Sequence, residues 1–348
     1  MPSRVESLRR YLALGRAVLR ARRAPFDPFK LTWILGEQCS LRCRTCGLWH
    51  RPHQGPSLSQ VREVIQHNPQ LTWVNLSGGD FVERSDAPAL VEAVAHGLPD
   101  LALLDFPTAG QDERGALAAL EPALDSDVPR IYVSVSLDGP DDVHDKLRGR
   151  DGAAARARAT YRRLASIRRR GLSVVVGTTL SRHNLEAGTD AARVLPDGIE
   201  AERVHLNLAH DSPHYYRNGV GSAAAPEVTQ AALDALRRRR RFSLAPLALM
   251  ERRYWSLARQ FLKHGRVQGS CGALVASVFL ASDLTLYPCS IYDRPLGSLP
   301  ELGWSLRELA RRPAARQARD DAERGTCPGC WSPCEAFPTL LAGFGRTL

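Results

Sequence analysis

Residues 30–46, KLTWILGEQCSLRCRTC, join a short apolar segment to three closely spaced cysteines. Leu31–Leu35 is predicted to be a strand, and Cys39, Cys43 and Cys46 follow it with the spacing C-x3-C-x2-C. Three thiolates on one loop can bind three irons of a four-iron cubane. Because the next cysteine is Cys271, the fourth iron would keep an open coordination position.

A structural zinc site is the alternative for this cluster. Zinc sites have four ligands, commonly in paired C-x2-C or C-x2-C…H-x3-H arrangements, and His50 or His53 could supply the fourth ligand here. The x3-then-x2 spacing directly after a strand favours the iron–sulfur interpretation.

Outward from this loop, apolar strand-like segments alternate with helical segments. Such alternation predicts βαβ units and a parallel sheet. Six units are fewer than the eight of a closed TIM barrel. The expected fold class is therefore α/β, a partial (β/α)6 TIM barrel followed by a small cysteine-rich C-terminal domain. The other predicted strands are Trp73–Leu76, Leu101–Phe106, Arg130–Leu137, Leu172–Thr179 and Arg203–Leu208. The main predicted helices are Ser57–Gln66, Ala87–Ala95 and Ala153–Arg170.

Three of these strands end in turns that contain glycine. They are Ser77-Gly78-Gly79-Asp80, Pro107-Thr108-Ala109-Gly110 and Asp138-Gly139-Pro140. Each is an ordinary turn when taken alone. Because ligands of parallel α/β sheets bind at the carboxyl ends of the strands, the three turns and the cysteine loop are expected to form one site.

A second group of cysteines lies near the C-terminus. Tight cysteine clusters in a chain without secretion signals indicate metal ligands rather than disulfides. Structural zinc and an iron–sulfur cluster are both open for this group. Its members are Cys271, Cys289, Cys327, Cys330 and Cys334.

The expected domain organisation has four parts: residues 1–29, a basic amphipathic N-terminal helix; 30–220, the partial barrel; 221–265, a helical connection; and 266–348, the cysteine-rich domain. In the N-terminal helix, Val5, Leu8, Leu12 and Leu19 fall near one face. This stripe is expected to pack on the following domain, with a membrane surface as the alternative.

The net charge of +10 comes almost entirely from arginine. Arg237–Arg241 reads as a solvated helix end, because cations suit a helix C-terminus. A metal-stapled nucleic-acid-binding protein without radical chemistry is the alternative function, although no interleaved aromatics support a nucleic-acid partner. The chain has neither a long apolar run for a transmembrane segment nor a signal core, which predicts a cytoplasmic protein. If the N-terminal helix lies on a membrane surface, the protein would be peripheral at the membrane.

Residues 30–215 resemble the radical S-adenosylmethionine (radical SAM) superfamily, in its SPASM/twitch-type branch. The cysteine triplet matches, and Gly78-Gly79-Asp80 resembles the family's Gly-Gly-Glu motif. Thr45 stands where an aromatic residue is usual, and Trp49 is the candidate to cover adenine instead. Thr108–Gly110 resembles the family's Thr-Asn-Gly turn. The family's fourth-strand signature is matched by Ser136–Gly139, His144-Asp145 and Arg148-Gly149. The segment Asp283–Cys289 resembles the hairpin of SPASM and twitch domains, with Leu284 in place of the usual glycine.

The resemblance implies an enzyme, either an oxidoreductase or a substrate-modifying maturase. A [4Fe–4S] cluster with exchangeable SAM would cleave SAM reductively to a 5′-deoxyadenosyl radical, which abstracts hydrogen from a peptide, sugar alcohol or lipid. Gly78, Gly79 and Asp80 would receive the methionine amino group, and Ser136 would lie near the ribose or carboxylate. The electron donor would be a flavodoxin or ferredoxin.

For the C-terminal region, the resemblance implies one auxiliary [4Fe–4S] cluster. Its expected ligands are Cys271, Cys289, Cys327 and Cys330, with Cys334 as a spare or alternative ligand. A loop after the sixth strand carries His210, His214, Tyr215 and Tyr216, which either line the substrate pocket or only pack the loop.

Overall fold

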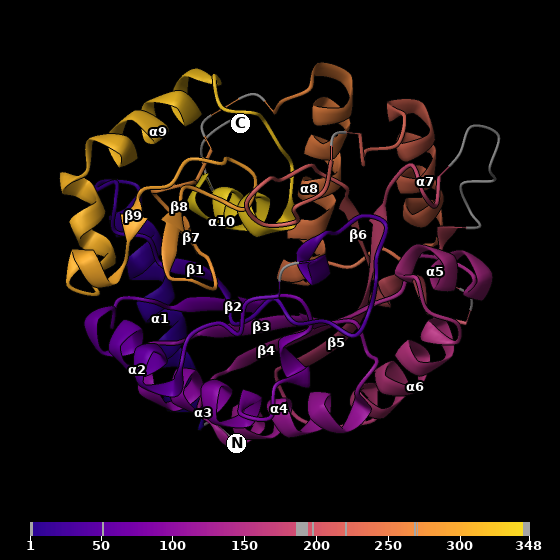
Figure 1. Ribbon diagram of the computed structural model, residues 1–348, viewed down its shortest axis with the longest axis horizontal. Helices are drawn as coiled ribbons and strands as arrows, with labels where there is room; N and C mark the ends of the chain where they lie inside the picture. Colours follow the sequence, from indigo (N-terminus) through magenta and orange to yellow (C-terminus); the bar gives the residue numbers. More distant parts are fainter. Residues whose placement is uncertain are drawn as a thin grey trace.

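The computed structural model describes residues 3–50, 52–185, 194–196, 198–219, 221–267, 269 and 271–343. Its strands form one nine-stranded sheet in the order β6-β5-β4-β3-β2-β1-β7-β8-β9. The first six are all parallel, and helices cover their outer side (Figure 1). They are β1 Lys30–Ile34, β2 Trp73–Ser77, β3 Leu103–Thr108, β4 Arg130–Ser136, β5 Leu172–Leu180 and β6 Val204–Leu208.

Helices follow the strands in the alternation that the sequence predicts. The α-helices are α1 Arg4–Ala21, α2 Leu58–His67, α3 Ala87–Gly97, α4 Glu113–Asp125, α5 Asp141–Arg148, α6 Ala153–Ala165, α7 Pro226–Arg239, α8 Pro246–His264, α9 Pro313–Arg324 and α10 Pro333–Gly343. Short 3₁₀ turns occur at Leu48–His50, Phe81–Glu83, Ala201–Arg203, Pro300–Leu302 and Leu306–Arg311. The predicted partial (β/α)6 barrel is confirmed.

Side-chain hydrogen bonds explain two helix boundaries. At the start of α2, Ser57 and Gln60 form a capping box, in which the backbone amide of each residue donates to the side chain of the other. Helix α6 ends at Ala165, five residues earlier than predicted. The reason lies in Arg169, whose guanidinium donates to the carbonyls of Ser126 and Val128 and holds the chain in a non-helical connection.

The C-terminal region continues the barrel's own sheet. Strand β7 (Ser277–Leu280) pairs in parallel with β1, and β8 (Thr285–Tyr287) and β9 (Gly297–Ser298) follow as antiparallel strands. Without β7, β1 would be an edge strand with unpaired backbone groups. The region predicted as a separate domain therefore shares one sheet and one hydrophobic core with the barrel.

Helix α1 does not pack as predicted. Val5, Leu8, Leu12 and Leu19 are 79%, 59%, 52% and 53% exposed, so the large apolar stripe faces away from the protein. The opposite, buried face has small residues, such as Ala17 and Ala21, that allow close approach to the sheet. In the part of the chain that the structure describes, no helix is long and apolar enough to cross a membrane.

Candidate active site

The three cysteines of the first group lie on the loop that leaves β1. Backbone hydrogen bonds hold this loop to two distant segments. The amide groups of Arg42 and Arg44 donate to the last residues of α5, Arg148 and Leu147, at 3.0 and 2.9 Å. Gly47 donates to the carbonyl of Tyr216 at 2.7 Å. The loop is thus clamped between the end of α5 and the segment after β6.

Cys39, Cys43 and Cys46 are all partly exposed free thiols. Burial raises the pKa of Cys39 to about 12, and the nearby Asp80 and Cys43 add to the rise. Burial likewise raises the pKa of Cys46 to about 11. Without a cation Cys39 and Cys46 stay protonated at neutral pH, so these two thiols need a bound metal centre to become thiolates. Among the described residues, no three His, Cys, Asp or Glu side chains converge closely enough to hold a single metal ion.

A half-buried arginine faces the middle cysteine. Arg148, at the end of α5, points a guanidinium nitrogen at Cys43 Sγ, 3.8 Å away. Asp138, which follows β4, accepts from Arg148 at 2.6 and 2.8 Å and from the amide of Thr179 at 2.8 Å. Burial works against the charge on Arg148, but Asp138 and Cys43 together raise its pKa above the usual value. The arginine therefore presents a fixed positive charge to the cysteine loop.

His144 stabilises the turn that carries Asp138. Its Nδ1 accepts a hydrogen bond from the Asp138 amide at 3.0 Å, and its side chain is fully buried. Burial, aided by the charge of Arg148, lowers the pKa of His144 to about 4. The imidazole is therefore neutral at physiological pH and carries its proton on Nε2. Ser136 is the last residue of β4, the strand that precedes this turn. It is half-buried and pairs with Gly177 of β5.

Gly78 and Gly79 pack directly against the segment that leads to the cysteines. A Cβ on Gly79 would lie 2.2 Å from the Gln38 carbonyl oxygen, and one on Gly78 would lie 2.1 Å from that of Gly36. Gly78 also has φ +150°, which favours glycine. The resemblance implies that these glycines receive the methionine amino group of SAM. The structure shows that the side-chain space is already occupied by the protein's own backbone.

Asp80 joins the ends of β2 and β3 and is 2% exposed. Its Oδ2 accepts from the Thr108 hydroxyl at 3.1 Å and from the Ala109 amide at 2.9 Å. Burial and the nearby Glu83 raise the pKa of Asp80 to about 7. Its Oδ1 is buried with no hydrogen-bond partner among the described residues. An orphaned carboxyl oxygen beside the cysteine loop is suited to an amino group of a bound ligand.

Glu37 connects the cysteine loop to the C-terminal region. Its buried carboxylate forms an ion pair with Arg217 of the segment after β6 at 2.8 Å, and its Oε1 accepts from Arg217 at 3.0 Å and from Ser282 of the β7–β8 turn at 2.8 Å. Beside Arg217 opens a cavity of about 770 Å³. Its lining comes from the end of the cysteine loop and the segment after β6: Gly47, His50, Pro52, His53, Pro213, Arg217 and Asn218.

The two histidines that could complete a zinc site have other contacts. The ring of His50 stacks on Trp49 at 3.6 Å, and His53 Nδ1 accepts from the amide of Gly55 at 3.0 Å. Trp49 donates from its indole nitrogen to the Cys46 carbonyl at 2.9 Å, and Arg42 lies over its ring. Trp49 is therefore anchored to the cysteine loop itself.

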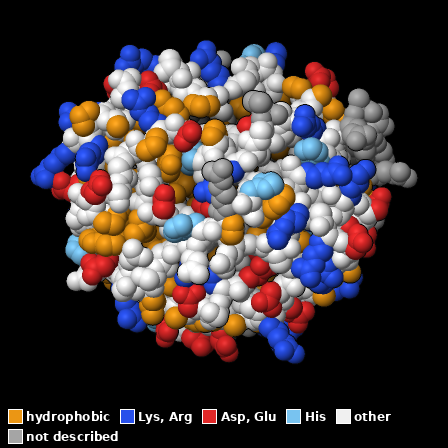
Figure 2. Space-filling view, in the orientation of Figure 1, with side chains coloured by type: hydrophobic (Ala, Val, Ile, Leu, Met, Phe, Trp, Pro, Cys, Tyr) orange, Lys and Arg blue, Asp and Glu red, His pale blue; other side chains and the backbone are white. Residues whose placement is uncertain are grey.

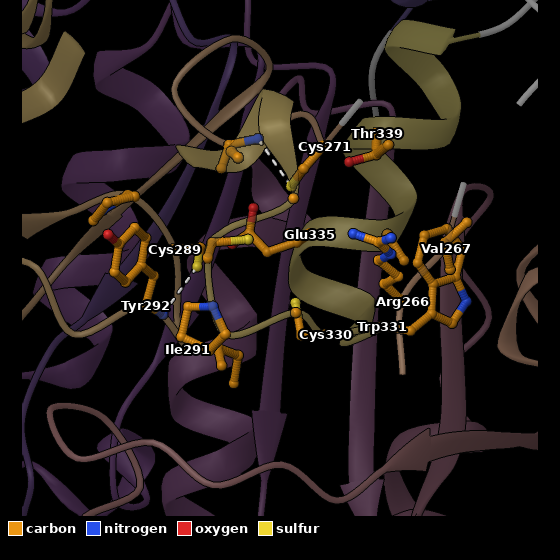
Figure 3. A pocket seen from close by; sticks show the side chains of 18 of the residues that line it. Arg266, Val267, Cys271, Cys289, Ile291, Tyr292, Cys330, Trp331, Glu335 and Thr339 are labelled. Atoms are coloured by element: carbon orange, nitrogen blue, oxygen red, sulfur yellow. Dashed lines mark hydrogen bonds between the residues drawn. The ribbon is translucent and has the colours of Figure 1, made fainter. Parts of the chain in front are cut away.

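The second group of cysteines surrounds a separate cavity of about 100 Å³ (Figure 3). Cys271, Cys289, Cys327 and Cys330 line it, as the sequence predicts for one four-ligand centre. Backbone amides point at two of the sulfurs, from Ala273 to Cys271 at 3.4 Å and from Tyr292 to Cys289 at 3.2 Å. Such amide donors stabilise thiolates.

Cys334 is not part of this lining, although it is only four residues beyond Cys330. It begins the first turn of α10, and its carbonyl accepts from the buried ammonium of Lys30. Glu335, the next residue, does line the cavity, and its side chain points between the cysteines in Figure 3. Its Oε1 has no hydrogen-bond partner among the described residues. Sequence reasoning missed Glu335, since a carboxylate beside a cysteine motif has no distinctive spacing.

The segment after β6 lies between the two cysteine groups. Tyr215 packs beside Cys46, and its hydroxyl is 2.8 Å from that of Ser77. His214 Nε2 lies 3.0 Å from the Cys289 carbonyl, and His210 Nε2 accepts from the amide of Trp331 at 3.3 Å. These side chains, predicted to line a substrate pocket, are used largely to join the barrel to the C-terminal region.

No family model matches this chain, and no curated protein matches it in sequence. Solved structures do. Native anSMEcpe with bound AdoMet is 14% identical over 91% of this chain and 98% of that chain, with a TM-score of 0.58. SuiB from Streptococcus suis is 13% identical over 80% of this chain and 64% of that one, with a TM-score of 0.54. Both are radical SAM enzymes.

The chain has the radical SAM fold. Within this fold, the loop after β1 and the turns after β2, β3 and β4 meet at one edge of the sheet, as the sequence predicts. They bring together Cys39, Cys43, Cys46, Gly78, Gly79, Asp80 and Thr108, with Arg148 as an addition. The second cysteine group forms a site of its own, from which Cys334 is absent.

Proposed function

We propose that this protein is a radical SAM enzyme in which Cys39, Cys43 and Cys46 hold a [4Fe–4S] cluster with one iron open to SAM. The observation that carries the proposal is the meeting of the cysteine loop with the ends of β2, β3 and β4. The likeness to structures of anSMEcpe with bound AdoMet supports it. So does the C-x3-C-x2-C spacing, which leaves one cubane iron without a protein ligand.

The residues present fit this cofactor. The Cys39 and Cys46 thiols have raised pKa values and need positive charge to ionise, which iron supplies. Arg148 faces Cys43 Sγ and would stabilise the electron density on a ligating sulfur. Asp80 Oδ1 is a buried acceptor without a partner among the described residues, which suits it to accept from the methionine amino group.

When bound, the cluster supplies the electron that cleaves SAM to methionine and a 5′-deoxyadenosyl radical. The protein's part is binding and orientation. Asp80 would accept from the amino group, and Ser136 would contact the ribose or carboxylate. Trp49, held against the cysteine loop, is placed to cover an adenine ring. The Glu37–Arg217 ion pair holds the segment after β6 against this loop and so helps to keep water from the reacting centre.

An auxiliary [4Fe–4S] cluster is proposed for the second site. Four thiols around one cavity match the four ligands of a saturated cubane, with Cys334 outside the set. Zinc has the same number of ligands and is the rival occupant. Reduction of the first cluster would come from a flavodoxin or ferredoxin in the cytoplasm.

The proposed substrate class is a peptide, ahead of the sugar alcohol and lipid alternatives. Two of the similar structures contain a bound peptide: anSMEcpe with the Cp18Cys peptide and SuiB with the precursor peptide SuiA. The cavity of about 770 Å³ beside Arg217 is large enough for one or two side chains of such a substrate. Modification of a peptide would make this protein a maturase.

The test is anaerobic release of 5′-deoxyadenosine. The reconstituted protein, reduced with dithionite and supplied with SAM, is expected to produce it, and Cys43→Ala is expected to produce none. Cys334→Ala is the matched control, because this cysteine lies outside both proposed ligand sets. Release by Cys43→Ala at the parent rate would overturn the proposal.

A further inference from the structure

Helix α1 has two apolar faces, of which only one is used within the protein. The outer face carries Val5, Leu8, Leu12 and Leu19, all more than half exposed. Their spacing of three, four and seven residues puts them on one stripe. Arg4 and Arg16, both exposed, fall on either side of this stripe. An exposed apolar stripe between arginines is the pattern of a helix that lies in a membrane surface.

A second exposed apolar group lies in the connection between α7 and α8. Phe242 and Leu244 are 70% and 72% exposed, and Leu247 and Leu249 in the first turn of α8 are 41% and 45% exposed. Arg252 lies over the ring of Phe242. Just before the group, α7 ends in the arginines at 237–239, which are exposed. Large apolar residues gathered in this way on a surface mark an interaction site.

Both groups lie at the amino ends of the barrel strands. The start of α1 is held there by Arg9 and Arg10, which donate to the carbonyls of Pro99 and Leu101, just before β3. The second group is held by Arg240, which donates to the carbonyls of Ala201 and Val204, at the beginning of β6. The cysteine loop lies at the opposite, carboxyl ends.

The five consecutive arginines Arg237–Arg241 have two roles. Arg240 is structural: it pairs with the buried Glu251 at 2.5 Å and stacks on Trp255. Its neighbours at 237–239 and 241 are exposed and add positive charge beside Phe242. On the face shown in Figure 2, by contrast, acidic and basic side chains are interspersed.

We propose that this end of the barrel docks on an anionic membrane surface, through the outer face of α1 and the apolar group at 242–249. The two groups would enter the boundary between headgroups and acyl chains, and the flanking arginines would contact lipid phosphates. The positive charge selects anionic lipid over neutral lipid. Docking in this orientation leaves the cysteine-bearing end of the barrel facing the aqueous phase, where a peptide and an electron donor can reach it.

The experiment is co-flotation of the full chain with lipid vesicles. We expect binding to vesicles of phosphatidylcholine mixed with anionic phosphatidylglycerol, weaker binding to pure phosphatidylcholine, and loss of binding as salt is raised. Leu8→Ser with Leu12→Ser should weaken binding by about tenfold per leucine, from the area that each buries. Phe242→Ser with Leu244→Ser should do the same.

Charge is tested with a matched pair of arginines. Arg238→Ala should weaken binding to the anionic vesicles by roughly fivefold, whereas Arg150→Ala, an exposed arginine at the opposite end of the barrel, should leave it unchanged. The substituted side chains are exposed, so circular dichroism should show unchanged folding. No flotation with anionic vesicles, or equal flotation of the Leu8/Leu12 variant, would overturn the proposal. A concentration-dependent dimer that the same variant abolishes would instead identify the surface as a contact between two copies. Release of 5′-deoxyadenosine does not depend on either result.

Discussion

Gly79→Ala tests whether glycine is needed at this position for packing of the turn against the cysteine loop rather than for binding of a ligand. The added methyl carbon would lie 2.2 Å from the Gln38 carbonyl oxygen and 2.8 Å from that of Glu37, both backbone atoms. Relief requires the turn after β2 and the cysteine loop to separate. Overpacking costs roughly 1–3 kcal/mol, and loss of the hydrogen bond from the Asp80 amide to Gln38 adds about 1 kcal/mol. We therefore expect a loss of roughly 2–4 kcal/mol in the free energy of unfolding.

Urea unfolding of the metal-free protein measures this loss, followed by circular dichroism and by Trp fluorescence. The matched control is Gly15→Ala in α1, where a Cβ would have no heavy atom within 4 Å. That change should raise stability by about 0.5–1 kcal/mol, from the higher helix propensity of alanine. If Gly79→Ala kept the parent urea midpoint and lost only SAM affinity, the glycine would serve ligand approach, and our packing argument would be refuted.

Two further predictions concern metal content and pH. After anaerobic reconstitution the parent should hold about eight irons per chain, Cys330→Ala about four, and Cys334→Ala about eight, by the stoichiometry of two cubanes; one zinc and about four irons in the parent would make the second site a zinc staple. The pKa of His144 is about 4 in the folded protein and 6.5 in the unfolded chain. Between these pH values the native state binds fewer protons than the unfolded state, so the protein loses stability as the pH falls from 6.5 to 4. The loss due to this group should reach roughly 3 kcal/mol. In His144→Asn the amide oxygen can accept the same hydrogen bond, so urea titrations at several pH values should show a smaller loss than in the parent. The same pH dependence in both proteins would show that His144 titrates normally.

Much of the fold follows from local patterns that the sequence displays. Apolar strands separated by helical segments predicted the six parallel strands, and the turns after them predicted which residues share an edge. Helix α5 was missed, although two acidic residues in its first turn and Gly149 just after its end are helix signals. Helix α4 was also missed; Pro122 lies inside it, and an interior proline argues against a helix.

Contacts between distant segments could not be predicted. The pairing of β7 with β1 joins Lys30 to Ser277, and no local pattern indicates that partner. The contact between Arg148 and Cys43 spans 105 residues, so the motif around Arg148 gave no hint that it faces the cysteine loop. For α1, hydrophobic periodicity identified the apolar stripe, but it carries no information on whether the protein covers that stripe.

The central claim is that Cys39, Cys43 and Cys46 hold a cluster with one iron open to SAM. Electron paramagnetic resonance of the reduced protein tests it most directly, in a Cys271→Ala/Cys330→Ala background that removes the second site. The account predicts a reduced [4Fe–4S] spectrum that changes when SAM is added, because SAM becomes a ligand of the open iron, and the spectrum should be absent when Cys43→Ala is added. A cluster spectrum that SAM leaves unchanged, or one that persists without Cys43, would contradict the account.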